Sequence, residues 1–213
     1  MGQIRNGANG GFSGKAGSVI GSSWRSIDYI KGLSRRRVKP SAQSQLDQQS
    51  RFALIVSFLA PLKNLMERSY SSRDTSRATG YNLAVHENLN KAVTGISPDF
   101  SIDFSKLLIS RGALQRPISP KMTSEKSGII EVAWFPGSDD LTGSPDDVAN
   151  IVLYNTTERV HLLSLGKATR EEGKIEIPFP DEFSSDSIEG LMFFSSTDGK
   201  YSESAYLGKV TAF

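Results

Sequence analysis

Short apolar runs recur at regular spacing along residues 121–213, and this spacing constrains the fold more than any other feature of the chain. Each run is rich in β-branched or aromatic residues and ends at turn residues; the runs cover 129–135, 150–154, 160–165, 174–179, 191–195 and 205–210. Six or seven such strands around one central tryptophan, Trp134, are typical of a sandwich of two antiparallel sheets. We therefore predict an all-β sandwich at 117–213, of the immunoglobulin or fibronectin type III kind. The chain contains no cysteine, which favours the fibronectin-like version because that version needs no disulfide between its sheets.

The middle of the chain predicts two helices. Apolar residues recur every three or four positions over 46–66 and again over 81–93. Pro61 lies inside the first stretch, and an interior proline costs about 3 kcal/mol, so we expect a kink or break at 57–60. Gly95 follows the second stretch and is expected to cap it in the left-handed conformation. Because the connection between them is short, the two helices are expected to form an antiparallel hairpin.

Segments with strand character flank these helices. The alternation of apolar and polar residues over 100–109 predicts one or two strands. At 17–32, β-branched and aromatic residues predict two short strands joined by a turn at 21–23. The helices can bury their apolar faces against these strands, so we predict a small α+β unit at 17–116 in front of the sandwich. The fold class of the whole chain is therefore predicted to be α+β.

Residues 1–16 are predicted to form a glycine-rich basic arm. Five of the nineteen glycines lie there, and ordering so many glycines is entropically costly. We therefore expect the arm to gain structure only by docking onto another surface. An arm packed against its own subunit would remove the case for assembly, and for binding of a polyanion, through the arm. The Gly-Lys pair at 14–15 does not complete a phosphate-binding loop, because Asn9 stands where the pattern needs glycine and Ala16 where it needs serine or threonine.

The charge is divided sharply between the two halves of the chain. Residues 1–116 contain 17 Lys and Arg against 7 Asp and Glu, a net +10, whereas residues 117–213 contain 8 against 16, a net −8. Such a division indicates either a polyanionic partner for the basic half or contact between opposite halves of neighbouring copies.

A cluster of cations beside two aromatic residues is the candidate nucleic-acid site. Aromatic planes next to Arg and Lys can stack single-stranded bases and neutralise their phosphates, and here Trp24 and Tyr29 supply the planes. The candidate cations are Arg25, Lys31, Arg35, Arg36, Arg37 and Lys39. The alternative interpretation of the same run is a solvated linker in front of Pro40.

Several other classes of function are not indicated by the sequence. Without cysteine and with only His86 and His161, the chain offers no thiolate nucleophile and no metal centre built on those side chains. The carboxylates at 139–140 and 146–147 could hold calcium, but their spacing matches no EF-hand, and turn charges explain them better. We expect no catalytic residues, no cofactor and no small-molecule substrate. The N-terminus lacks the pattern of a secretory signal, and the longest apolar run, 52–62, is shorter than the roughly 20 residues of a membrane span. We therefore expect a protein that is cytoplasmic as synthesised.

Two segments carry a resemblance to a known family. They are SGKAGSVIGSSW at 13–24 and LLISRG at 107–112. With these blocks and a C-terminal sandwich ending in SESAYLG, the chain resembles an uncharacterised bacterial domain-of-unknown-function family over nearly its whole length. The resemblance implies this arrangement of segments and no particular activity or site residue.

Two functional hypotheses follow from these patterns. The first is a non-enzymatic structural or assembly protein, phage-related or part of an assembled particle, that forms homo-oligomers or a filament through its N-terminal arm. The apolar residues expected to make the oligomer contact are Phe12, Val19, Ile20, Trp24 and Tyr29. The alternative is a nucleic-acid-binding protein without sequence preference that uses the basic N-terminal half.

Overall fold

The computed structural model describes residues 2–3, 12–24, 27–34, 40–70, 78–138 and 141–213. The chain divides into two compact units, residues 1–46 and residues 47–213, and each is described by itself. This division differs from the three predicted segments, 1–16, 17–116 and 117–213. The reason is a core that the helices share with the sandwich, described below.

The N-terminal unit is a four-stranded antiparallel sheet. Its strands are β1 (Gly2–Gln3), β2 (Gly14–Ala16), β3 (Val19–Trp24) and β4 (Ile27–Gly32), in the order β1-β4-β3-β2. The two strands predicted at 17–32 are present, but the turn predicted at 21–23 is wrong, because those three residues lie inside β3 and pair with β4. Gly21 is needed there for close approach. A Cβ atom at this position would lie 2.7 Å from ring carbons of Phe12, which lies across the strand.

The second unit contains the predicted β-sandwich. One sheet has the order β10-β9-β12-β13 and the other β11-β8-β7, and all neighbouring strands are antiparallel. The strands are β7 (Ile118–Lys126), β8 (Ile129–Phe135), β9 (Val148–Asn155), β10 (Val160–Thr169), β11 (Lys174–Pro178), β12 (Ser187–Ser195) and β13 (Ala205–Thr211). Each of the six predicted runs is a strand, so the sandwich prediction is confirmed. Only β7 escaped prediction, because its sequence, ISPKMTSEK, is polar and contains a proline.

The space between the two sheets is filled by apolar side chains around Trp134. This tryptophan is buried as predicted, packs edge-on against Phe194, and donates from its ring nitrogen to the Arg170 carbonyl oxygen at 2.9 Å. Met122, Ile130, Val132, Ile151, Leu153, Met192 and Leu207 belong to the same core.

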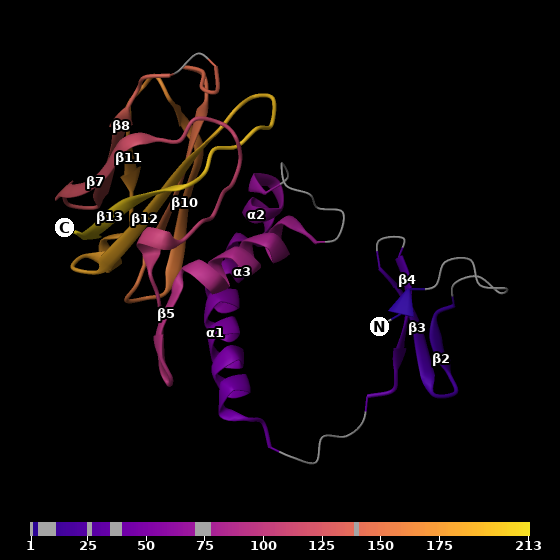
Figure 1. The fold of residues 1–213 in the computed structure, drawn as a ribbon. Coiled ribbons are helices and arrows are strands. Elements are labelled where there is room, and N and C mark those ends of the chain that lie inside the picture. The colour runs from indigo at the N-terminus through magenta and orange to yellow at the C-terminus, as the bar shows by residue number, and fades with distance from the viewer. Residues whose placement is uncertain (1, 4–11, 25–26, 35–39, 71–77, 139–140) are drawn as a thin grey trace. The chain divides into compact units, whose positions relative to one another are not determined.

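The helical region lies beside the β10-β9-β12-β13 sheet of the sandwich (Figure 1). It consists of α1 (Gln43–Leu59), a 3₁₀ turn η1 (Ala60–Leu62), α2 (Lys63–Ser69) and α3 (Gly80–Lys91). The expected interruption is present: the regular helix ends at Leu59, inside the predicted range 57–60, and Pro61 lies in the 3₁₀ turn that follows. None of the helices in the described ranges is both long and apolar enough to pass through a lipid bilayer.

Residues 92–114 match their prediction only in part: one strand is present at 99–102, where one or two were expected over 100–109. Gly95 is not a helix cap: it has a φ of +100° within the hairpin of β5 (Val93–Ile96) and β6 (Asp99–Ile102). The hairpin is followed by a 3₁₀ turn, η2 (Phe104–Lys106). Leu107 and Ile109, predicted to lie in a strand, are buried in irregular backbone. Side chains make the hydrogen bonds to this backbone that a neighbouring strand would otherwise make. Asn88 donates to the Leu108 carbonyl oxygen at 2.7 Å and accepts from the Leu108 N–H at 2.8 Å.

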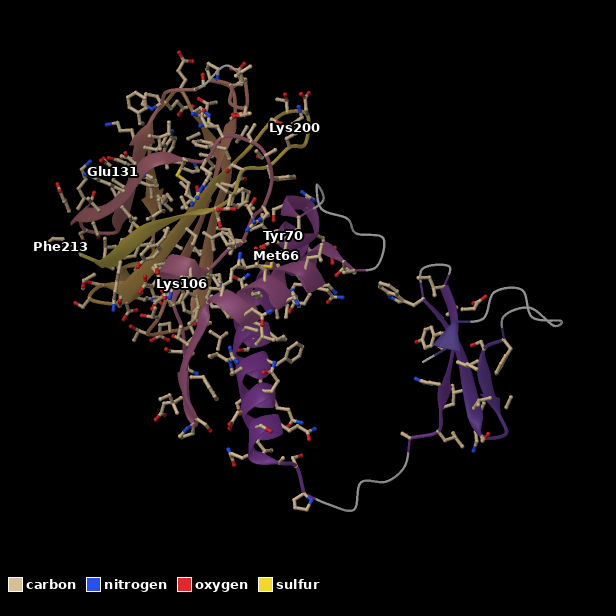
Figure 2. The ribbon with its side chains drawn as sticks, in the orientation of Figure 1. Met66, Tyr70, Lys106, Glu131, Lys200 and Phe213 are labelled. Atoms are coloured by element: carbon tan, nitrogen blue, oxygen red, sulfur yellow. The ribbon has the colours of Figure 1, made fainter. Side chains whose placement is uncertain are left out.

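Strands β9 and β12 are buried on both faces, and this joins the helices to the sandwich. Along β12, Met192 and Phe194 point into the sandwich core, whereas Leu191 and Phe193 belong to a second core with the helices. Met66 and Tyr70, near the end of the helical segment, are nearly inaccessible to solvent within this second core (Figure 2). The helices therefore pack on the outer face of this sheet of the sandwich and share a core with it.

Candidate functional site

The N-terminal sheet presents an aromatic face. The pairs Ile20 with Lys31, Ser22 with Tyr29 and Trp24 with Ile27 are cross-strand partners, and such partners point to the same side of a sheet. Lys15 on β2 is the other neighbour of Ile20 and lies on this side as well. We call the set Lys15, Ile20, Trp24, Ile27, Tyr29 and Lys31 the aromatic face.

The aromatic face is not covered by a core. Among the described residues of 12–46, Gly21 is the only buried residue, and no apolar side chain is fully buried. Trp24 remains 40% exposed, while Ile20, Ile27 and Tyr29 are half-buried. A sheet of three or more strands needs a hydrophobic face for stability, and the aromatic face is the apolar side of this one. An exposed apolar face with a polar rim is the usual mark of an interaction surface.

The structure separates the predicted oligomer-contact residues into two groups. Ile20, Trp24 and Tyr29 lie together on the aromatic face, whereas Val19 lies on the opposite face, where Phe12 covers Gly21. The predicted free arm also differs from the structure. Its described parts are 2–3 and 12–16, and of these 2–3 and 14–16 are strands of this same sheet, so the arm packs within its own chain. By the criterion given above, this removes the case for assembly or polyanion binding through a docking arm. The surface of this unit that is left for either role is the aromatic face.

Of the predicted nucleic-acid residues, the structure describes only Lys31. It is exposed in β4, two residues from Tyr29 on the same face. Arg25, Arg35, Arg36, Arg37 and Lys39 lie outside the described residues. Lys15 was missed by the sequence reasoning, because only the strand register shows that it flanks Ile20.

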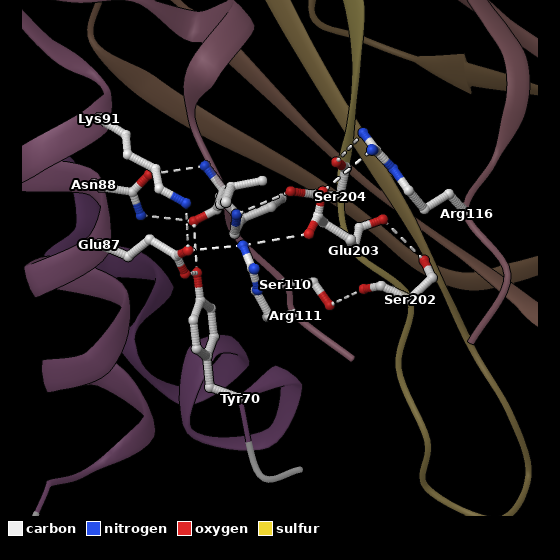
Figure 3. A network of polar contacts seen from close by, with 12 residues as sticks. Tyr70, Glu87, Asn88, Lys91, Ser110, Arg111, Arg116, Ser202, Glu203 and Ser204 are labelled. Carbon is white, nitrogen blue, oxygen red and sulfur yellow. Dashed lines mark hydrogen bonds and ion pairs between the residues drawn. The ribbon is translucent and has the colours of Figure 1, made fainter. Parts of the chain in front are cut away.

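A polar network in the second unit joins α3 to the connection before β7 and to the loop between β12 and β13 (Figure 3). Glu87 accepts from Arg111 at 2.7 Å and from Lys91 at 2.8 Å. Glu203 contacts Arg111 at 3.3 Å and Arg116 at 3.1 Å. Since the cations and carboxylates alternate, the network fastens three segments together.

The serines of this network bond to the backbone. Ser110 donates to the Ser202 carbonyl oxygen at 2.7 Å, and the Ser202 hydroxyl accepts from the Phe194 N–H at 2.8 Å. The Ser204 hydroxyl accepts from the Ile109 N–H at 3.1 Å. These hydroxyls hold irregular backbone in place, which indicates that the network has a structural role.

A cavity of about 490 Å³ adjoins the network. Its cations are already matched by carboxylates: Lys91 by Glu87, Lys106 by Asp103 at 3.0 Å and Arg116 by Glu203. Tyr206, also in the wall, donates to Glu189; burial, with that hydrogen bond, raises the pKa of the tyrosine hydroxyl. The balanced charge gives the cavity little preference for an anion or a cation.

A second hollow, of about 290 Å³, lies over a buried ion pair. Arg170 and Asp147 are 0% and 1% exposed and meet at 2.9 Å, and the guanidinium carbon lies 3.9 Å above the ring of Phe194. Asp147 Oδ1 and Arg170 Nη1 are buried without a hydrogen-bond partner. Both groups are enclosed, so the pair joins the residue before β9 to the residue after β10 inside the protein.

Asp147, one of the carboxylates considered as a calcium ligand, accepts hydrogen bonds from Arg170 and from the Ser144 N–H. Asp139 and Asp140 lie outside the described residues. In the part of the chain that the structure describes, no three His, Asp or Glu side chains gather as metal ligands would. The ion pair could not be predicted from the sequence, because Glu171 and Glu172 follow Arg170 directly and are nearer candidates for pairing than Asp147.

Comparison with known proteins gives similar solved structures, among them an fn3 domain, and one family. The fn3 domain of human collagen alpha-1(XX) chain is similar at 12% identity, with 47% of this chain and 86% of that chain covered and a TM-score of 0.34. No curated protein matches the chain. The resemblance noted in the sequence is confirmed: residues 11–208 match the family of unknown function DUF6266, and the chain belongs to that family.

Proposed function

We propose that this protein is a non-enzymatic structural or assembly protein whose aromatic face docks onto another copy of the chain. The observation that carries the proposal is the N-terminal sheet itself, a compact unit whose described residues bury no apolar side chain. The exposed part of Trp24, with Ile20, Ile27 and Tyr29, supplies the surface to be covered. Fully burying one such side chain contributes about 1.5–3 kcal/mol.

Charge favours the acidic part of a neighbouring copy as the partner of the aromatic face. Lys15 and Lys31 flank Ile20, whereas residues 117–213 carry a net charge of −8 from 8 cations and 16 anions. Contact between two different surfaces of identical copies closes a ring or continues as a filament. We place such an assembly in a bacterial particle, phage-related, with the protein made in the cytoplasm.

The test is the mass of the full-length protein in solution. Trp24→Ser should weaken association about 30-fold, since a central aromatic anchor contributes about 2 kcal/mol or more. Ile96→Ser, which removes an 85% exposed apolar residue that lies outside both the aromatic face and residues 117–213, should leave association unchanged. Light scattering over a concentration series measures both variants. Equal behaviour of Trp24→Ser and the unchanged protein would overturn the proposal, and so would a strictly monomeric protein.

A second candidate function is binding of single-stranded nucleic acid without sequence preference. It is favoured by the position of Lys15 and Lys31 on the same face as Trp24 and Tyr29, which would let bases stack where phosphates are neutralised. Adding Arg25, Arg35, Arg36, Arg37 and Lys39 would bring about six phosphates into contact, and log affinity would then fall with log salt at a slope of about −4 for a single strand. Gel shift with Lys31→Ala and with the triple alanine variant of 35–37 separates the two functions.

A further inference from the structure

Three of the four edge strands of the sandwich are protected against pairing with another chain. Unpaired edges invite pairing, and proline, charge, irregular register or a covering segment prevents it. β7 contains Pro120 and two irregularities in its pairing with β8, β11 contains two charges and Pro178, and β13 carries Lys209 and lies beside β7.

The fourth edge, β10, lacks this protection over residues 160–165. The segment reads VHLLSL, without charge or proline, and pairs with β9 in unbroken register; the irregularity comes only after Leu165. Val160, Leu163 and Leu165 are 42%, 46% and 40% exposed. The sheet order leaves the other side of β10 without a strand neighbour in the described chain. A regular, uncharged and partly apolar edge of this kind is built to accept a strand.

We propose that residues 160–165 pair antiparallel with the same residues of a second copy, around a two-fold axis. The two four-stranded sheets then form one sheet of eight strands, a size that open sheets reach. This inference goes beyond the proposed function, since it uses a surface of residues 47–213 and does not involve the aromatic face.

Self-complementarity identifies a second copy as the occupant. In antiparallel pairing, partners across the strands share a face, so Leu163 and Leu165 of each copy would lie against the same apolar side chains of the other. The uncharged segment would meet an uncharged segment. Glu158 at one end of the strand would come near Lys167 at the other end of the second copy, and all three flanking charges, including Arg159, are exposed. A charged strand from another protein would find no matching charge within 160–165.

The chain contains no cysteine, so a cysteine introduced at a chosen position reports on that position alone. A single cysteine is placed at each of positions 160–165 in turn in the full chain, and the rate of disulfide-linked dimer formation is measured. Pairing around a two-fold axis brings one or two neighbouring positions within the roughly 4.4–6.8 Å between Cα atoms that a disulfide needs. Those positions should cross-link at least about 10-fold faster than Phe135→Cys, which is exposed on the other sheet.

A charge variant tests the same contact by affinity. Leu163→Lys places like charges in the paired edge and should weaken dimerisation about 100-fold, whereas Phe135→Lys should not change it. Both are measured by sedimentation in a Trp24→Ser background, so that assembly through the aromatic face is removed first. The proposal fails if no position in 160–165 cross-links faster than the control, or if Leu163→Lys, shown to be folded by thermal unfolding, dimerises normally. Cross-linking that peaks within 160–165 supports it even where Leu163→Lys does not fold.

Discussion

His161 is an imidazole held between aromatic rings where the helices meet the sandwich. Its ring centre lies 4.8 Å from those of Phe58 and Tyr154, and its Nε2 atom is buried without a hydrogen-bond partner. Burial lowers the pKa of His161 from 6.5 to about 4. The folded protein therefore keeps this side chain neutral at a pH where the unfolded chain has already protonated it.

The sign of the pH effect follows from this difference. The free energy of unfolding should fall as pH drops from about 6.5 towards 4, since only the unfolded state binds the proton in that window, and should level off below it. His161→Phe keeps the ring packing and should remove about 1 kcal/mol of this loss, a figure reduced for partial exposure. Urea unfolding at pH 7 and pH 4.5 measures the difference. His86→Gln, at an exposed position, should retain the full pH dependence.

At the scale of single elements, β12 shows what a strand shared by two cores requires. Phe193 and Phe194 are adjacent, both 0% exposed, and point to opposite faces, one towards the helices and one into the sandwich. Phe193→Ala and Phe194→Ala should each cost about 3–5 kcal/mol. Calorimetry should show one shared transition for residues 47–213 in each variant. A helical region that melted separately in Phe193→Ala would show that the two cores are independent.

The elements also show which parts of the fold the sequence predicts. The sandwich strands were predicted because apolar residues recur there in short runs with turns between them. β7 was missed because one of its faces is polar. Residues 107–109 were wrongly predicted to be a strand because side chains, including that of Asn88, make the hydrogen bonds that a neighbouring strand would make. At the candidate site, Ile20, Trp24 and Tyr29 were identified from residue type alone. Their common face was hidden by the incorrect turn at 21–23, since a glycine followed by two serines has the composition of a turn.

At the scale of the whole molecule, the domain boundary was the least predictable feature. The segments that join the helices to β9 and β12 are distant in sequence, and no local pattern in the helices shows what they pack against. The continuous apolar character of β9 and β12 was the available signal, because strands covered on one face alternate and strands covered on both do not. The aromatic face and residues 160–165 lie on different units. A copy that used both surfaces could therefore bind two other copies at once and extend a chain of subunits.

The double coverage of β9 and β12 has a practical consequence for anyone dissecting this protein. A fragment cut at residue 117 would retain all seven sandwich strands and yet leave Val152, Leu191 and Phe193 bare on its outer surface. Such a piece should be sticky and poorly soluble despite its intact architecture. The smallest soluble fragment should start at or before α1. Comparing its yield of monodisperse protein with that of the 117–213 fragment measures how far the helices shield the apolar outer face of the sheet from solvent.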